Sequence, residues 1–342
     1  MTKAVVGKLE VRSSMKTILC VAACVIALMS NAAPKKPLAL SHTIPLPGIK
    51  GRFDHFAIDA NGQRLFVAAL GNNTLEILDI ENAKRLHSIT SLHKPTGVLY
   101  LASANQIGVA NGDDGTFRIY DGQDYKLVAT MKALDDADNV RFDAKANRVY
   151  VGYGDGALAA IDPTTWKTLT AIKLSAHPES FQLEAQGDKI FVNLPDSKQI
   201  AVVDRKKQTV AAKWALERFQ ANYPMSLDES NHRLLVGCRK PGQLVVFDTD
   251  AGKPVAHVAL SGDTDDLFYD PKSKSIYISC GEGFIDVVAQ RDPDNYERID
   301  RIATQAGART SFFSNERRQF YLAVPQGGVN PAELRIYSAS GQ

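Results

Sequence analysis

Four acidic residues recur at matching places along the sequence and could together hold a cation. They are Asp54, Asp138, Glu179 and Asp265, each five residues before the end of a short strand-like segment. Carboxylate oxygens are the ligands that Ca²⁺ and Mg²⁺ prefer in proteins. His55 and His177, which lie close by in the sequence, would widen the choice to Mn²⁺ or Zn²⁺. The acids predict a site for one divalent metal ion, provided that the fold brings them together.

The same position occurs seven times in the chain, and its residues predict a ring of polar groups. The seven residues are Asp54, Thr96, Asp138, Glu179, Tyr223, Asp265 and Arg309, and those that directly follow them are His55, Gly97, Asn139, Ser180, Pro224, Asp266 and Thr310. Carboxylates held close in a partly buried site raise each other's pKa values unless a cation compensates them. The compensating cation could be Arg309, a divalent metal or a cationic organic ligand. If Arg309 and waters alone compensate the carboxylates, the ring has a purely structural role.

The candidate ligand-binding residues are therefore Asp54, His55, Asp138, Asn139, Glu179, Tyr223, Asp265 and Arg309, with Asp138, Glu179 and Asp265 as the candidate metal ligands. No catalytic nucleophile is predicted. The sequence lacks the short motifs of a nucleophile elbow, a phosphate-binding loop, a dinucleotide-binding loop, haem attachment and a zinc-protease helix. Acid–base chemistry by a carboxylate or histidine of the ring is compatible with this composition.

A repeat of about 42 residues must position these groups. An apolar run, such as LEILD, FRIYD or LVVFD, ends at positions 79, 121, 162, 204, 248, 289 and 338, at spacings of 42, 41, 42, 44, 41 and 49. About ten residues before each run lies a second apolar segment, such as RVYVGY (148–153). Alternating apolar residues with β-branched and aromatic side chains are typical of strands. A third segment upstream and a fourth downstream make four strands per repeat.

Seven repeats of four antiparallel strands predict an all-β, seven-bladed β-propeller. A β-sandwich also uses short strands, but it does not predict a repeat of this length. The last repeat ends one strand short at Gln342, while residues 38–46 fit the missing strand. We therefore expect the N-terminal strand to complete the last blade and close the ring. In such a ring the recurring acids meet at one mouth of the central channel.

Other polar residues are expected at the same mouth. His93 and His177, each just before or near a proline, are predicted to point toward it, and the loops after the second strands add Asn72, Asn111, Asp113, Tyr153, Asn193, Arg239 and Glu282. Cys238 and Cys280 occupy equivalent positions of adjacent repeats. They are interpreted as small buried residues ending a strand, with a disulfide or a role as metal ligands as the alternatives.

The N-terminus resembles a secretory signal. Met15 and Lys16 precede an apolar run, 18–29, and a small-residue ending, which predicts cleavage near Ala32 and a periplasmic or secreted protein. Residues 1–32 are then an N-terminal extension and signal peptide, and 33–342 form one propeller domain. Lipoprotein processing at Cys24 is the alternative. The formal net charge of +2 gives no nucleic-acid signature, and the mature chain has no expected transmembrane segment.

The repeats resemble those of the YncE-like, YVTN-type propeller family. The resemblance rests on His93–Asp121, Asp138–Asp162 and His177–Asp204, although the literal YVTN tetrapeptide is absent. It implies a secreted or periplasmic seven-bladed ring without fixing a function. A more distant similarity to gluconolactonase-like propellers implies that Glu179, Asn139 or Asn193, and Asp265 could hold a divalent metal.

Two functions follow as hypotheses. The first is an exported binding protein whose acidic funnel takes up a metal ion, a small ligand or a protein partner. The second is a metal-dependent hydrolase or lyase that acts on a lactone or sugar-derived compound in the same funnel. An electron-transfer role has no cofactor motif to support it.

Overall fold

The computed structural model describes residues 1–10, 36–59, 61 and 63–340. The chain divides into two units, Met1–Lys35 and Lys36–Gln342. Residues 1–10 are exposed and have no regular secondary structure. The expected signal peptide, with its cleavage site near Ala32 and the alternative at Cys24, lies outside the described residues. Within the described residues, no helix is long and apolar enough to cross a membrane.

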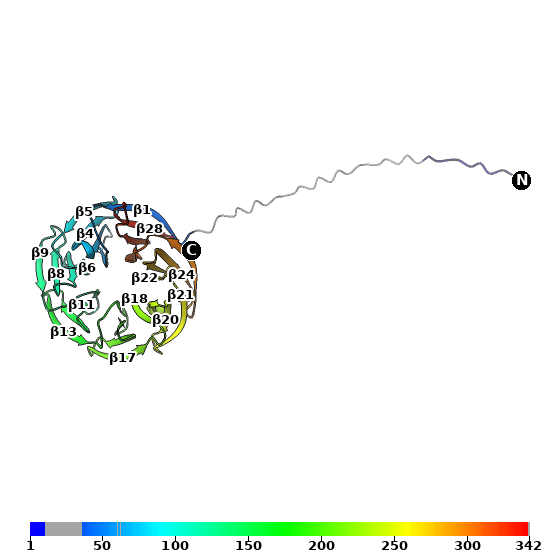
Figure 1. Ribbon diagram of the computed structural model, residues 1–342. Helices are drawn as coiled ribbons and strands as arrows, with labels where there is room; N and C mark the ends of the chain where they lie inside the picture. The colour runs from blue at the N-terminus through cyan, green and yellow to red at the C-terminus, as the bar shows by residue number, and fades with distance from the viewer. Residues whose placement is uncertain (11–35, 60, 62, 341–342) are drawn as a thin grey trace. The chain divides into compact units, whose positions relative to one another are not determined.

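Residues 36–340 form seven four-stranded antiparallel sheets in a ring, which confirms the predicted fold (Figure 1). Blades one to four follow the chain in order. Their strands are β2 (Phe56–Ile58), β3 (Arg64–Ala69), β4 (Thr74–Asp79) and β5 (Lys84–Ile89); β6 (Pro95–Leu101), β7 (Gln106–Asn111), β8 (Thr116–Asp121) and β9 (Leu127–Met131); β10 (Val140–Asp143), β11 (Arg148–Tyr153), β12 (Ala157–Asp162) and β13 (Lys167–Lys173); and β14 (Phe181–Leu183), β15 (Lys189–Leu194), β16 (Gln199–Asp204) and β17 (Thr209–Ala215).

Blades five to seven complete the ring. Their strands are β18 (Gln220–Asp228), β19 (Arg233–Lys240), β20 (Gly242–Asp248) and β21 (Lys253–Ala259); β22 (Thr264–Asp270), β23 (Ser275–Cys280), β24 (Phe284–Asp292) and β25 (Asn295–Ala303); and β26 (Ser311–Ser314), β27 (Gln319–Val324), β28 (Ala332–Ala339) and β1 (Leu38–Leu46). Two short 3₁₀ helices, Leu70–Asn72 and Glu229–Asn231, lie in turns.

The first strand of the chain closes the ring, as the sequence predicts. β1 pairs antiparallel with β28, from Leu38 opposite Ala339 to Leu46 opposite Ala332. The innermost strand of the last blade, β26, contacts that of the first, β2. β1 supplies the outer strand of a blade whose first strand starts about 270 residues later, at Ser311. The two ends of the propeller are therefore tied together, and each of the seven described sheets has four strands.

The core lies between neighbouring blades. Each apolar cluster joins the facing sides of two adjacent sheets, as where Leu65 and Val67 of blade one pack against Tyr321 and Leu334 of blade seven. The second and third strands are almost wholly buried, whereas the outermost strands expose most of their residues. A single blade therefore has both faces covered only when two neighbours are present.

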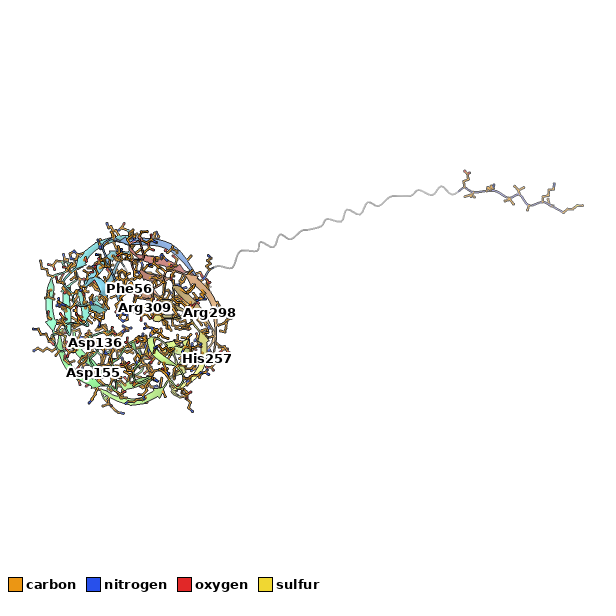
Figure 2. The ribbon with its side chains drawn as sticks, in the orientation of Figure 1. Phe56, Asp136, Asp155, His257, Arg298 and Arg309 are labelled. Atoms are coloured by element: carbon orange, nitrogen blue, oxygen red, sulfur yellow. The ribbon has the colours of Figure 1, made fainter. Side chains whose placement is uncertain are left out.

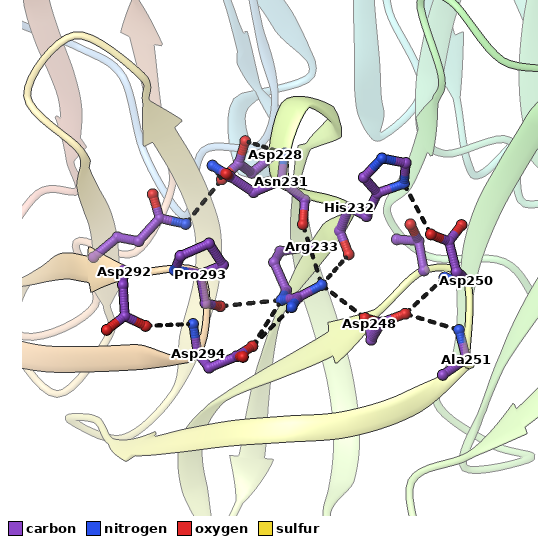
Figure 3. Close-up of polar contacts among 12 residues, drawn as sticks. Asp228, Asn231, His232, Arg233, Asp248, Asp250, Ala251, Asp292, Pro293 and Asp294 are labelled. Atoms are coloured by element: carbon purple, nitrogen blue, oxygen red, sulfur yellow. Dashed lines mark hydrogen bonds and ion pairs between the residues drawn. The ribbon is translucent and has the colours of Figure 1, made fainter.

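The acids that end the first strands join one blade to the next. The Asp143 carboxylate accepts hydrogen bonds from the backbone of its own turn, at Lys145 and Ala146. Its second oxygen lies 2.9 Å from the Arg205 guanidinium of blade four. Blades five and six are joined in the same region by Arg233, which binds Asp248 of its own blade and Asp294 of the next (Figure 3).

The Asp143–Arg205 pair generates a prediction about stability. Both side chains are buried, at 2% and 7% exposure. We expect Asp143→Asn to lower the free energy of unfolding by about 3 kcal/mol, because a buried guanidinium then loses its countercharge. Urea denaturation measures the change. The matched control is Glu297→Gln, which breaks the exposed pair with Arg291 and should cost no more than about 0.5 kcal/mol. Equal effects of the two substitutions would contradict this account.

Candidate functional site

A polar cavity of about 270 Å³ opens at one mouth of the central channel. All eight candidate ligand-binding residues line it: Asp54, His55, Asp138, Asn139, Glu179, Tyr223, Asp265 and Arg309. Figure 2 labels Arg309 near the middle of the ring. Residues from six blades thus meet at the axis. We refer to this space as the first cavity.

A repeated backbone hydrogen bond holds the acids at the mouth. The N–H groups of Asp54, Asp138 and Glu179 donate to the carbonyls of Ala68, Gly152 and Asn193, at 2.8–3.0 Å. These carbonyls occupy equivalent places on the second strands β3, β11 and β15. Because the bond recurs from blade to blade, each acid leaves its blade at the same height and toward the axis.

Blade two supports the segment that carries Asp138. Thr96 donates its hydroxyl hydrogen to the Ala137 carbonyl at 2.7 Å. Its neighbour Gly97 lies so close to blade three that a Cβ atom would overlap the Asp138 carbonyl oxygen. Glycine is therefore required here for the two blades to approach each other.

His55 is the internal cation of the first cavity. Its Nε2 lies 3.6 Å from carboxylate oxygens of both Asp54 and Asp138, and its Nδ1 lies 3.8 Å from Asp266. Burial opposes the charged imidazolium, but the three carboxylates outweigh it and raise the pKa of His55 to about 10. A histidine that is protonated at neutral pH compensates charge and is not available as a metal ligand.

The amide of Asn139 faces this imidazolium. Its Nδ2 lies 2.9 Å from His55 Nε2, while its Oδ1 is buried without a partner among the described residues. Rotating the amide by 180° exchanges the two atoms and lets Oδ1 accept the Nε2–H of a protonated His55. The buried amide of Asn139 can thus accept a hydrogen bond from the protonated imidazole of His55.

The acids of the first cavity differ in their proton affinity. Burial raises the pKa of Asp54 to about 7, partly against the effect of His55. For Asp138, burial is outweighed by its hydrogen bond and attraction to His55, and its pKa is lowered. Burial, together with the nearby carboxylates of Asp138 and Asp265, raises the pKa of Glu179 well above its ordinary value. Asp54 has His55 as a close cationic partner, whereas Glu179 has no cationic side chain within 4.0 Å among the residues that the structure describes.

Arginines neutralise the opposite side of the first cavity. Asp265 forms ion pairs with Arg239 and, at 3.1 Å, with Arg309. The Arg239 guanidinium also stacks over the Tyr223 ring, with its carbon 3.7 Å from the ring centroid. The sequence predicts Asp265 as a metal ligand with Asp138 and Glu179, but the structure places it against two guanidinium groups instead.

His177 completes a different group of possible metal ligands. Oxygen or nitrogen atoms of Asp138, His177 and Glu179 lie within 4.8 Å of one another. His177 Nδ1 donates to the Gly154 carbonyl at 2.7 Å, which leaves Nε2 as the free ring nitrogen. Apart from its backbone N–H, which donates to Asn193, Glu179 makes no hydrogen bond, and its carboxyl forms no ion pair with any residue that the structure describes. The ligand atoms of a second group, Asp54, His55 and Asp138, also lie within 4.8 Å of one another, but His55 carries a proton there.

Three further residues, which the sequence does not predict at the mouth, line the first cavity, namely Arg52, Lys94 and Asp136. Each lies two residues before a member of the recurring position, as His177 does. Alternate residues of an extended chain point to the same side. The repeat alignment itself could therefore have found them.

Several other expected lining residues lie elsewhere. Of the loop residues after the second strands, only Arg239 reaches the first cavity. Asn111 and Asn193 are buried and hold backbone groups of the blades. His93 lies 3.9 Å from Asp114 instead of pointing into the cavity. The prediction that both histidines face the mouth is therefore wrong for His93. It lies three residues before Thr96, whereas His177 lies two residues before Glu179, and successive residues of an extended chain point to opposite sides.

Cys238 and Cys280 are free and fully buried. Burial raises the pKa of Cys238 to about 12, so the thiol remains protonated and inert at neutral pH. The interpretation of both as small buried residues is confirmed, and the disulfide alternative is excluded.

Comparison with known proteins supports the fold and the resemblance. No profile of a known protein family matches the chain. YncE of Salmonella typhimurium and YncE of Salmonella typhi are each 23% identical over 229 residues, which cover 65% of this chain and 64% of each relative. The alignment therefore spans less than two thirds of the length of these relatives.

Solved structures share the fold at low sequence identity. Kuenenia stuttgartiensis hydrazine synthase matches with a TM-score of 0.70 and 15% identity, over 81% of this chain and 94% of that one. A chain of the mitotic checkpoint complex gives 0.75 and 13%, over 99% of both chains. The RRP9 WD40 repeats give 0.77 and 9%, over 89% and 100%. The chain is a seven-bladed β-propeller similar to YncE.

Proposed function

We propose that this chain is an exported binding protein that takes up one divalent metal ion in its first cavity, held by Asp138, His177 and Glu179. The proposal of export rests on the signal-like N-terminal sequence. The proposal of metal binding rests on the ligand group at the mouth of the channel, where acids from two neighbouring blades converge with a histidine.

The unpaired carboxyl of Glu179 is the observation that carries the proposal. Every other acid of the recurring position has a cationic partner: Asp54 and Asp138 have His55, and Asp265 has two arginines. Glu179 has no such partner within 36–340, and its pKa is raised by burial and by like charges. A bound divalent cation would offset both the cost of burying a charged carboxylate and its repulsion by the neighbouring acids.

The chemistry of the ligands favours Zn²⁺ or Mn²⁺ over Ca²⁺ or Mg²⁺. An imidazole nitrogen with two carboxylates suits borderline transition metals, whereas Ca²⁺ and Mg²⁺ prefer oxygen ligands alone. The hydrogen bond from His177 Nδ1 to the Gly154 carbonyl is the support that metal-binding histidines commonly have. It fixes the ring so that Nε2 can bind the metal.

A metal-dependent hydrolase or lyase, acting on a lactone or a sugar-derived compound, is the second candidate function. Three protein ligands leave coordination positions open, as in catalytic zinc sites. Arg52 and Lys94 line the same cavity and could hold a developing negative charge. The test is whether the metal-loaded chain hydrolyses any of a panel of lactones. Hydrolysis that is lost in Glu179→Gln would favour this function over simple binding.

A protein partner at the mouth of the channel is compatible with metal binding. One fold neighbour was solved as part of the mitotic checkpoint complex. The exposed rim of the cavity carries Arg52 and Asp136, which offer both signs of charge to a partner loop.

Metal binding can be tested directly. We expect the purified chain to bind one equivalent of Zn²⁺ or Mn²⁺ in isothermal titration calorimetry, and Glu179→Gln to weaken that binding at least about tenfold through the loss of a ligand. Glu282→Gln, an exposed acid outside the cavity, is the matched control and should bind as the unmodified chain does. A chain that takes up no stoichiometric metal, and whose melting temperature does not respond to either ion, would refute the proposal.

The pH dependence of binding follows from Glu179. Its pKa is raised in the folded chain, so at low pH a proton occupies the carboxyl and competes with the metal. Affinity should therefore increase as the pH rises through the titration range of Glu179, with a proton released on binding at the lower pH. Calorimetry in two buffers of different ionisation enthalpy counts that proton. In Glu179→Gln the pH dependence should be weaker, and an unchanged slope would assign the proton to another group.

A further inference from the structure

The channel has a second cavity, of about 400 Å³, that differs in character from the first. It is lined by the innermost strands further along their course, and His55 and Ser180 lie on the boundary between the two cavities. Arg141 lies three residues after Asp138 on the same inner segment, about 10 Å further along the channel. The apolar wall of the second cavity includes Leu99, Met225, Phe268 and Phe312.

Arg141 is the one side chain of the second cavity whose charge is not locally matched within the described residues. Its only hydrogen bond is from Nη1 to the Val140 carbonyl, at 2.8 Å, and no carboxylate lies within 4.0 Å. A guanidinium has five N–H donors, so most of them remain free. Burial lowers the pKa of Arg141, the direction expected for a cation that has left water without gaining a close partner.

The acid nearest in the channel is already engaged. Asp266 accepts a hydrogen bond from the Ser311 backbone N–H at 2.7 Å, and its other oxygen faces His55. It attracts Arg141 from a distance but does not satisfy its donors. The lining of the second cavity therefore offers the Arg141 guanidinium to an incoming anion.

The walls define the rest of the ligand. Phe268 and Phe312 form an edge-to-face pair with ring centroids 5.8 Å apart, and both are half-buried. Leu99 and Met225 continue the apolar lining. A volume of this size fits a small organic molecule, and an apolar group placed there would be removed from water.

We propose that the second cavity binds an amphipathic organic monocarboxylate, with its carboxylate on the Arg141 guanidinium and its hydrocarbon part against Phe268, Phe312, Leu99 and Met225. A planar carboxylate matches the two parallel N–H donors of an arginine. A dianion such as phosphate is disfavoured because Asp266 and Asp138 lie along the same channel. The proposal is independent of metal binding, since it uses none of the three metal ligands.

The test uses 3-phenylpropanoate as the probe, which is titrated into the purified chain in isothermal titration calorimetry. We expect saturable binding of one equivalent, at least about tenfold weaker in Arg141→Gln, where a charge-assisted pair of hydrogen bonds is lost. Phe312→Ser should also weaken binding. Arg291→Gln, which alters an exposed arginine near the end of β24, is the control and should change nothing.

The uncharged and cationic analogues keep the test independent of any variant. On the unmodified chain, 3-phenylpropanol and 3-phenylpropylamine should bind at least about tenfold more weakly than the carboxylate. Equal binding of the alcohol, or no saturation by the carboxylate up to about 10 mM, would overturn the proposal. Glu179→Gln should bind 3-phenylpropanoate within about twofold of the unmodified chain, so failure of metal binding and failure of this site are distinguished.

Discussion

The antiparallel pairing of β1 with β28 is the constraint on which the rest of the structure depends. It joins the start of the propeller to its end, so that the innermost strands encircle one axis and every blade has two neighbours. Without that closure the faces of the first and last sheets would stay exposed to water. Residues at one position of a repeat then converge, although Asp54 and Arg309 are far apart in the sequence. The first cavity is a direct consequence of the closed ring.

Convergence brings like charges together, and the protein balances most of them internally. His55 lies among Asp54, Asp138 and Asp266, and two arginines hold Asp265. The balance leaves one acid unmatched at the first cavity, Glu179, and one base without a close partner at the second, Arg141. Both exceptions line cavities along the same channel. Uncompensated groups in such places are where ligands of opposite charge are expected to bind.

The sequence predicts the fold and most of the residues that line the first cavity, because both follow from a repeat. The alternating apolar residues of the strands, the spacing of the apolar runs and the missing last strand can all be read from this one sequence. The pairing of charges is not local. Whether Asp265 binds a metal or pairs with Arg239 depends on the directions of side chains from different blades. The charge of His55 depends on its burial among carboxylates. The sequence predicts that His177 lies near the mouth, but its tautomer is fixed by the Gly154 carbonyl, which only the folded chain brings to it.

The central claim is that the unmatched acid of the ring marks a metal site formed by two adjacent blades. Anomalous diffraction from crystals grown with Zn²⁺ or Mn²⁺ tests it most directly. The account predicts one peak about 2.0–2.2 Å from a carboxylate oxygen of Asp138, from His177 Nε2 and from a carboxylate oxygen of Glu179. A peak at His55, or an ordered cavity with no peak at these three residues, would contradict it.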